Sequence, residues 1–194
     1  MNLELMTERT KLTPLAIADI DVALEMYTDP DVVKFIGKEV MSEDKIRQKM
    51  STWTKRGGDG CIGIWCISNR NTGEKYGSCF LLPMSIDDDD TNWDLVMPNV
   101  MPEGDVEVGY FLKQSSWGKG IATEVCWRLL KFVFEDTSLE EVVASVDDEN
   151  HRSKNVLEKA GFVHKGRMRA YGEVNPVYRI DREKWVELTK DEHY

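Results

Sequence analysis

Apolar side chains recur at helical and at alternating spacing along the chain, and these two patterns predict its helices and strands. The clearest helical pattern starts at Ile121, where apolar residues return every three or four positions as far as Val133 and charged residues occupy the opposite face. Weaker helical patterns end at breaker residues such as Gly161. The predicted helices cover residues 16–27, 32–35, 44–55, the stretch that starts at 121, and 150–160.

Runs that are rich in β-branched, aromatic and alternating apolar residues predict strands between these helices. The runs 61–68 and 75–82 are joined by Asn-Arg-Asn-Thr-Gly-Glu, which favours a β-hairpin. The other predicted strands are 2–12, 105–112, 142–146, 162–168 and 177–181. Because strands alternate with helices in the second half of the chain, the sequence indicates an α/β fold.

A long segment with neither pattern covers residues 83–104. It contains four consecutive aspartates at 87–90 and the near-repeat VMPNVMP, whose prolines exclude a helix interior or a central strand. A loop of this length inside a compact domain is usually mobile or functional. The aspartates have two interpretations: an ordinary solvated acidic surface, or a site that attracts a polyamine or a basic N-terminus.

The stretch WGKGIATE, residues 117–124, places two glycines just before the helix predicted from 121. Backbone amides that converge at the positive end of a helix bind anions, and glycines let a phosphate approach them closely. A simple glycine-rich turn is the alternative interpretation. The stretch lacks the spacing of a Walker motif and the third glycine of a dinucleotide fingerprint, which disfavours a nucleotide-dependent kinase or reductase.

Composition narrows the classes of function further. The 194 residues are 41% apolar and carry a formal net charge of −10, which fits one domain over residues 1–194 and argues against a nucleic-acid partner. No apolar run approaches the roughly 20 residues of a membrane span, and the N-terminus lacks a signal-peptide pattern. We therefore expect a cytoplasmic protein without a membrane partner. The four cysteines form no CxxC pair, so no metal site is expected.

Two longer stretches carry a family resemblance. EVGYFLKQSSWGKGIATE, at 107–124, and NHRSKNVLEKAGF, at 150–162, resemble the GNAT superfamily of acetyl-CoA-dependent N-acetyltransferases, especially its RimJ/RimL-like branch. The family motif Gln/Arg-x-x-Gly-x-Gly/Ala matches at Gly120 and Ala122, with Trp117 in place of the first polar residue.

The resemblance continues at both ends of the chain, in residues 7–37 and in VYRIDREKW at 177–185. It implies a single domain with an α/β fold, in which helices flank a mixed, mostly antiparallel central sheet. The loop at 83–104 is the part that resembles the family least.

The resemblance also implies that acetyl-CoA is the co-substrate, with its diphosphate on residues 117–122 and its pantetheine arm along 109–112. The residues assigned to cofactor binding are Tyr110, Phe111, Leu112, Trp117, Gly118, Lys119, Gly120, Ile121, Ala122, Thr123, Asn150 and Ser153. Asn150 is a good helix N-cap, so it either caps the helix alone or caps it and contacts the cofactor as well.

Two residues are assigned to catalysis. The acceptor amine must lose a proton, and Glu107, on the strand that carries the cofactor, is our candidate base; a structural ion pair is its alternative role. Glu74, in the hairpin turn, is a second candidate. Many family members protonate the departing thiolate with a tyrosine at the position that Leu157 occupies here. We therefore assign Ser153 as the hydrogen-bond donor to the leaving group.

The predicted function is transfer of an acetyl group from acetyl-CoA to a primary amine, directly in a ternary complex. The acceptor is a protein N-terminal α-amine, as in RimJ/RimL-like enzymes, or a small-molecule amine or polyamine. Candidates for the acceptor pocket are Trp53, Trp65, Trp93 and Tyr171, of which we expect some to be ordinary core aromatics. Because the usual tyrosine is missing, a non-catalytic acyl-CoA-binding sensor is the alternative function. A monomer and a homodimer are both compatible with the sequence.

Overall fold

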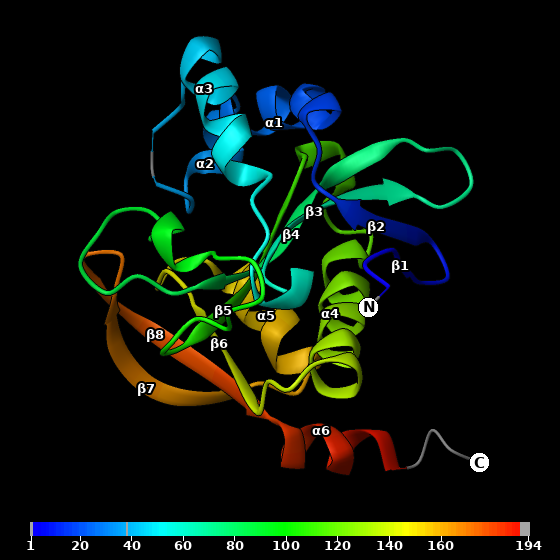
Figure 1. Ribbon diagram of the computed structural model, residues 1–194, viewed down its shortest axis with the longest axis vertical. Helices are drawn as coiled ribbons and strands as arrows, with labels where there is room; N and C mark the ends of the chain where they lie inside the picture. The colour runs from blue at the N-terminus through cyan, green and yellow to red at the C-terminus, as the bar shows by residue number, and fades with distance from the viewer. Residues whose placement is uncertain (1, 38, 191–194) are drawn as a thin grey trace.

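The computed structural model describes residues 2–37 and 39–190, and one eight-stranded sheet runs through them (Figure 1). The strand order is β1-β2-β3-β4-β5-β6-β8-β7. The strands are β1 (Leu5–Met6), β2 (Thr10–Pro14), β3 (Gly63–Asn69), β4 (Lys75–Pro83), β5 (Val106–Leu112), β6 (Glu141–Ser145), β7 (Val163–Ala170) and β8 (Glu173–Asp181).

The sheet consists of two antiparallel parts that meet at one parallel pairing. Strands β1 to β5 pair in an antiparallel manner, and so do β6, β8 and β7. Between the described residues of β5 and β6 a single parallel pair is registered, Glu107 with Val143. The two strands therefore part after Glu107, in the middle of the sheet.

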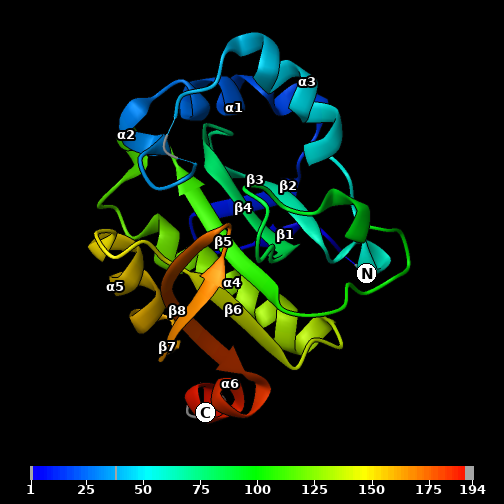
Figure 2. The same cartoon turned by 90° about the vertical axis from the view of Figure 1, so that its left-hand side faces the viewer.

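Helices lie around the sheet, and their bounds are α1 (Ile20–Tyr27), α2 (Pro30–Val33), α3 (Glu43–Trp53), α4 (Ile121–Asp136), α5 (His151–Lys159) and α6 (Arg182–Thr189). Helices α1 to α3 gather at one end of the molecule, while α4 packs against β5 and beside α5 (Figures 1 and 2). Side-chain caps start several helices: Ser42 accepts from the amide of Lys45 at α3, for example, which satisfies a donor of the first turn.

Helix α4 is the central helix of the core. Its buried side chains are Ile121, Val125, Cys126, Leu129, Leu130, Phe132, Val133 and Phe134. Burying one such side chain stabilises the fold by roughly 1.5–3 kcal/mol. The first turn of α4 is therefore firmly fixed, and so is the end of the glycine-containing loop that leads into it.

The predicted helix 16–27 and hairpin 61–82 are confirmed, but the strand predicted at 2–12 is wrong as a single element. It is a hairpin of β1 and β2, because the Thr7 hydroxyl accepts from the Thr10 amide at 2.7 Å and closes a turn between them. In addition, the first residues of the 16–27 helix form a 3₁₀ turn, Ile17–Asp19.

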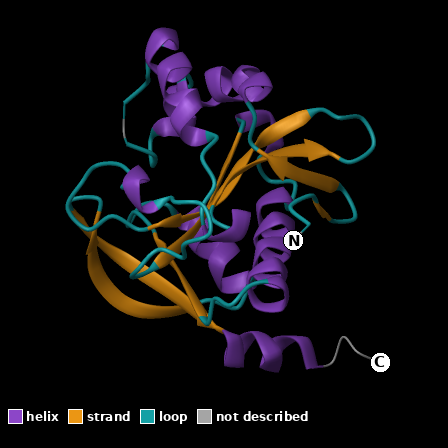
Figure 3. Cartoon of the chain, viewed as in Figure 1, coloured by secondary structure: helices purple, strands orange, loops and turns teal. Residues whose placement is uncertain are grey.

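Two further boundaries and one element differ from the prediction. The short helix expected at 32–35 starts at Pro30, because the Asp29 side chain caps it. Strand β8 starts at Glu173 rather than 177, where it pairs with Ala170 of β7. Helix α6 was not predicted. The loop predicted at 83–104 is irregular as expected, apart from Pro83, which ends β4, and a 3₁₀ turn at Trp93–Leu95 (Figure 3).

The four cysteines are free and buried, and burial raises the pKa of each thiol. Among the described residues no group of His, Cys, Asp or Glu has the arrangement of a metal site. Within the same residues, every helix is too short or too polar to cross a membrane. That residues 1–194 form one domain stays a prediction, which extends to residues 1, 38 and 191–194 outside the described part.

Candidate active site

A cleft of about 1500 Å³ opens where β5 and β6 part. The second half of β5 forms one wall, and the end of β6 with the start of α5 forms the other. All the residues predicted to bind the cofactor line this cleft except Lys119, and Glu107 lines it too. The structure thus brings together residues that are separated by up to 46 positions in the sequence, from Glu107 to Ser153.

Residues 117–122, called the cradle below, connect the end of β5 to α4. Gly118 and Gly120 have φ angles of +70° and +76°, a backbone region that strains any residue with a side chain. None of the amides of residues 118–122 donates to another described residue, and α4 has no side-chain cap. The helix therefore presents unpaired N–H groups at its positive end.

The cradle fits the diphosphate of a CoA thioester. A Cβ atom added at Gly118 would meet nothing within 4 Å, and at Gly120 it would meet only Arg9, at 3.4 Å. The space in front of the backbone is thus open, and an anion can approach the amides closely. Unpaired donors, open space and a positive helix end are together complementary to a diphosphate.

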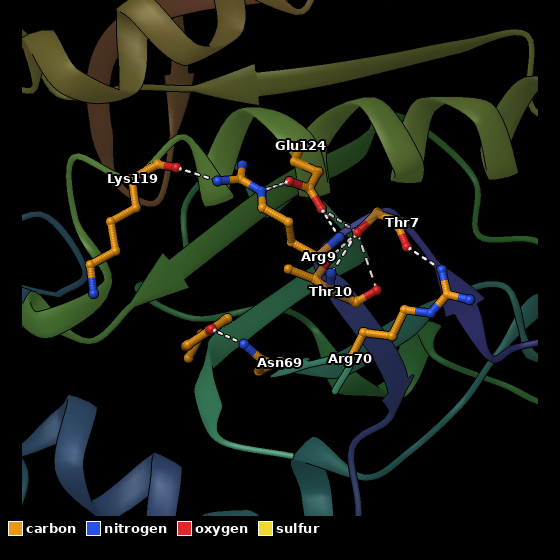
Figure 4. Close-up of polar contacts among 8 residues, drawn as sticks. Thr7, Arg9, Thr10, Asn69, Arg70, Lys119 and Glu124 are labelled. Atoms are coloured by element: carbon orange, nitrogen blue, oxygen red, sulfur yellow. Dashed lines mark hydrogen bonds and ion pairs between the residues drawn. The ribbon is translucent and has the colours of Figure 1, made fainter. Parts of the chain in front are cut away.

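Arg9 braces the cradle (Figure 4). Its guanidinium donates to the carbonyl of Lys119 at 2.8 Å and to the carboxylate of Glu124 at 2.5 Å. The Thr7 hydroxyl donates to the same carboxylate. Burial favours the neutral acid, but the hydrogen bonds from Thr7 and Arg9 prevail and lower the pKa of Glu124. No sequence signal indicates this brace, because it joins residues 110 positions apart.

Trp117 joins the cradle to β5. Its indole Nε1 donates to the Leu112 carbonyl at 2.8 Å. The guanidinium of Arg152 lies 5.0 Å from the centre of the indole ring, a cation–π contact. The tryptophan thus anchors the loop at a position where the family motif has a polar residue. Arg152 also adds a positive charge beside the cradle, which favours an anion.

Asn150 and Ser153 lie in the opposite wall. The Asn150 side chain accepts from the Ser153 amide at 3.1 Å, so it caps α5, which is one of its two predicted roles. The hydroxyl groups of Ser153 and Tyr110 are 3.1 Å apart, and the Tyr110 phenol also donates to the Ser153 carbonyl. Leu157 is 1% exposed and lies in the lining of the cleft, so the position of the family's usual tyrosine carries an apolar side chain with no proton to donate.

Glu107 is a buried carboxylate at the point where the strands part, with 5% of its surface exposed. One oxygen accepts from the amide of Ser145 at 3.1 Å, and the other from the hydroxyl of Tyr171 at 2.6 Å. Burial raises the pKa of Glu107 to about 7, against the opposing effect of these two hydrogen bonds. A base with this pKa can exchange protons at neutral pH.

Tyr171 occupies the tip of the β7–β8 hairpin, with a φ of +52°. Burial and the neighbouring Glu107 carboxylate raise the pKa of Tyr171, so its phenol stays protonated. The sequence predicted Tyr171 for the acceptor pocket but not its bond to Glu107. The sequence did contain a signal for the turn that carries Tyr171: a Tyr-Gly dipeptide between two β-rich runs favours a hairpin turn.

Of the remaining predicted site residues, some line the cleft and others lie away from it. Trp53 and Trp93 line the cleft, where Trp53 stacks on Tyr27 with ring centres 4.7 Å apart. Trp65 is one of the expected core aromatics and not a pocket residue, because it is 0% exposed. Glu74 is exposed in the β3–β4 turn and does not line the cleft.

Comparison with known proteins identifies the family. Residues 9–163 match the family described as "Acetyltransferase (GNAT) domain". The uncharacterized N-acetyltransferase p20 of Bacillus licheniformis is 27% identical over 168 residues, which are 86% of either chain. The putative ribosomal N-acetyltransferase YdaF of Bacillus subtilis is 35% identical over 63 residues, which are 32% of this chain and 34% of that one.

A solved structure has the same fold. The GNAT-family acetyltransferase from Bacillus anthracis superposes with a TM-score of 0.72 at 19% identity, over 93% of this chain and 99% of that chain. The family match extends over the cradle, Glu107 and the capped start of α5. The chain therefore belongs to the GNAT acetyltransferase family and is an N-acetyltransferase.

Proposed function

We propose that this enzyme transfers the acetyl group of acetyl-CoA directly to a primary amine held in the same cleft, with Glu107 as the base. One observation carries the proposal: a single cleft joins the cradle of unpaired amides to a buried carboxylate whose pKa is raised to about 7. The thioester supplies an activated acetyl carbonyl when it is bound. The protein then has to orient the amine and remove its proton.

Removal of the amine proton is the step that needs a base. A lysine-like amine with a pKa near 10.4 costs roughly 4–5 kcal/mol to deprotonate at pH 7, whereas an α-amine near pKa 8 costs only about 1.4 kcal/mol. The Glu107 carboxylate accepts two hydrogen bonds and has capacity for about four. It can therefore accept the amine proton directly or through one water molecule.

The leaving sulfur needs a hydrogen-bond donor, and we assign this role to Ser153. Burial raises the pKa of Tyr110, so its phenol stays a donor. The Tyr110 phenol has a single proton, and both the Ser153 carbonyl at 3.3 Å and the Ser153 hydroxyl oxygen at 3.1 Å lie within its reach. In the arrangement where the proton goes to the hydroxyl oxygen, the Ser153 O–H is free to point into the cleft. A hydrogen bond to a charged group contributes about 1.5–3 kcal/mol.

We further propose a protein N-terminal α-amine as the acceptor, as in RimJ/RimL-like enzymes, with small amines as the second class. The lower cost of deprotonating an α-amine supports this choice. A second support is the relative named a putative ribosomal N-acetyltransferase. The exposed carboxylate of Asp89 at the cleft favours a cationic substrate.

A panel of amines tests the proposed function. The purified protein is mixed with acetyl-CoA and with a basic peptide, the same peptide blocked at its N-terminus, or spermidine, and release of CoA thiol is followed. We expect thiol release with the free peptide and little with the blocked one. Acetyl-CoA binding without transfer to any amine would support the sensor instead, an alternative that the buried Leu157 favours. Absence of acetyl-CoA binding would contradict both functions.

A further inference from the structure

The acidic part of the long loop is attached to the β7–β8 hairpin. We call residues 85–91 the strap. The amide of Tyr171 donates to the carbonyl of Ser85 at 3.0 Å, and the amide of Gly172 donates to the carbonyl of Ile86 at 2.9 Å. The hairpin tip therefore docks on the strap through two consecutive backbone hydrogen bonds. Figure 1 shows the tip of β7 and β8 beside the loop that follows β4.

Charged side chains extend this attachment on both sides. Asp87 pairs with Arg169 of β7 at 2.6 Å, and Asp90 pairs with Lys49 of α3 at 2.5 Å. The strap thus connects α3 to the hairpin, and its residues Asp89, Asp90 and Thr91 line the cleft. Asp87 and Asp90 are paired within the protein, which leaves them poorly suited to attract a substrate.

The attachment ends at Glu107. The Tyr171 hydroxyl donates to the Glu107 carboxylate at 2.6 Å. Tyr171 makes this contact from a left-handed backbone conformation, φ +52°, which non-glycine residues rarely adopt but which the two-residue loop between Ala170 and Glu173 requires. The two strap hydrogen bonds at Tyr171 and Gly172 hold this turn in place. The strained turn and the docked strap are therefore parts of one arrangement.

We propose that the strap is a positioning device for the base: by docking the hairpin tip it holds the Tyr171 hydroxyl on Glu107 and favours the ionised carboxylate. Tyr171 is accordingly a positioning residue that acts through Glu107. The inference rests on the proposed function in one respect: it takes Glu107 to be the catalytic base. It gives the acidic run a role other than substrate capture.

The groups that face this pair are few. Tyr171 from the hairpin and the Ser145 amide from β6 donate to Glu107. Thr91 and Asp90 of the strap act on the Tyr171 phenol, and Asp90 is paired with Lys49 of α3. Both Glu107 and Asp90 disfavour ionisation of the Tyr171 phenol. The phenol therefore acts as a donor throughout the working pH range, and its removal leaves the carboxylate with one hydrogen bond.

Tyr171→Phe is the direct test, with the pH dependence of acetyl transfer as the readout. Because a hydrogen bond stabilises the ionised carboxylate, its loss should move the acid limb of the pH–rate profile upward by about one to two pH units. The same shift should appear without turnover, in the titration of the Glu107 carboxyl carbon followed by NMR on protein with ¹³C-labelled glutamate. An unchanged titration in Tyr171→Phe would overturn the inference.

Arg169→Ala tests the strap itself without altering Glu107 or Tyr171. Its matched control is Lys165→Ala, which removes an equal charge from the same strand at an exposed residue without an ion pair to the described chain. We expect the Glu107 titration to rise by less than about one pH unit in Arg169→Ala and not in the control. Equal titrations in both variants would show that the strap does not act on the base. Since NMR reads Glu107 without substrate, a failed amine panel would contradict the proposed function but not this inference.

Discussion

The cradle and the strap are both short irregular segments beside the cleft, and they use their hydrogen-bonding groups in opposite ways. The amides of residues 118–122 donate to no other described residue. In the strap, Asp87 and Asp90 form ion pairs, and the carbonyls of Ser85 and Ile86 accept from the hairpin tip. The cradle is thus open to a ligand, while the strap is engaged in holding the protein together.

This difference separates a binding segment from a structural one. A bound anion is held by donors that are unpaired in the free protein, because a donor that is already paired gains little from a new partner. Four aspartates in a row suggest attraction of cations, but Asp87 and Asp90 already have an opposite charge beside them, in Arg169 and Lys49. The number of unpaired hydrogen-bonding groups in a segment therefore indicates a ligand-binding role better than the number of its charged residues does.

Gly120→Glu should have the largest effect, because it places a carboxylate in the cradle. We expect acetyl-CoA affinity to fall by about 100-fold or more, since several amide–phosphate hydrogen bonds of about 1.5–3 kcal/mol would be lost or opposed. Calorimetry measures the affinity. The control is Gly104→Glu, at a φ of +86° with open space around it, which carries the same backbone strain outside the cleft. Equal affinity of the two variants would show that the cradle does not bind the diphosphate.

Glu107→Gln should have an effect of similar size, on turnover and not on affinity. At pH 8 we expect a loss of about 10²–10⁴-fold, because general-base catalysis contributes this much, with cofactor affinity near that of the wild type. Below pH 7 the wild-type carboxylate is itself protonated, since its pKa is about 7, so the ratio of the two rates should shrink. Glu74→Gln is the matched control, and a loss confined to that variant would exchange the two assignments.

Local features of the cradle could be predicted from the sequence. Its glycines, its helix start and the Asn150 cap lie within short continuous stretches, where backbone conformation follows from residue type. The apolar pattern of α4 was equally clear, because one helix face is buried along the whole element.

The strap, the brace and the environment of Glu107 could not be predicted, because they depend on long-range contacts. Tyr171 lies 64 positions from Glu107, and Arg169 lies 82 positions from Asp87. The sequence could not assign Trp65 to the core or to the pocket for a related reason. Its strand is buried on both faces, so alternation does not separate core aromatics from those of a pocket.

Ser153→Ala should reduce turnover by roughly tenfold, because one donor to the leaving sulfur is lost. If Tyr110 acts by orienting this hydroxyl, 3.1 Å away, Tyr110→Phe should lower turnover in the wild-type background but not further in Ser153→Ala. Steady-state kinetics of the single and double variants measure this coupling. Additive losses would assign the two hydroxyl groups to independent roles.

Glu107 should also make stability depend on pH. The folded protein holds the Glu107 proton up to a pH of about 7, whereas the unfolded chain releases it near 4.5. Stability should therefore decrease as the pH rises from about 4.5 to about 7, by about 3 kcal/mol from this residue. Urea unfolding of Glu107→Gln should lack this part of the pH dependence. Parallel stability profiles of wild type and variant would show that Glu107 ionises as an exposed glutamate does.

Asp89 tests the difference between the cradle and the strap at a single residue. It lies in the strap, but its side chain is unpaired, as the amides of the cradle are. It lines the cleft and makes no hydrogen bond or ion pair with the described residues around it. Asp89→Asn should raise the KM of the best cationic acceptor by about two- to fivefold, the size of an exposed ion pair, and less at high salt. Asp94→Asn, in the same loop but outside the cleft lining, should leave KM unchanged. If both substitutions raise KM equally, the loop acts on the substrate through its overall charge. The distinction between paired, structural aspartates and unpaired, substrate-facing ones would then be wrong.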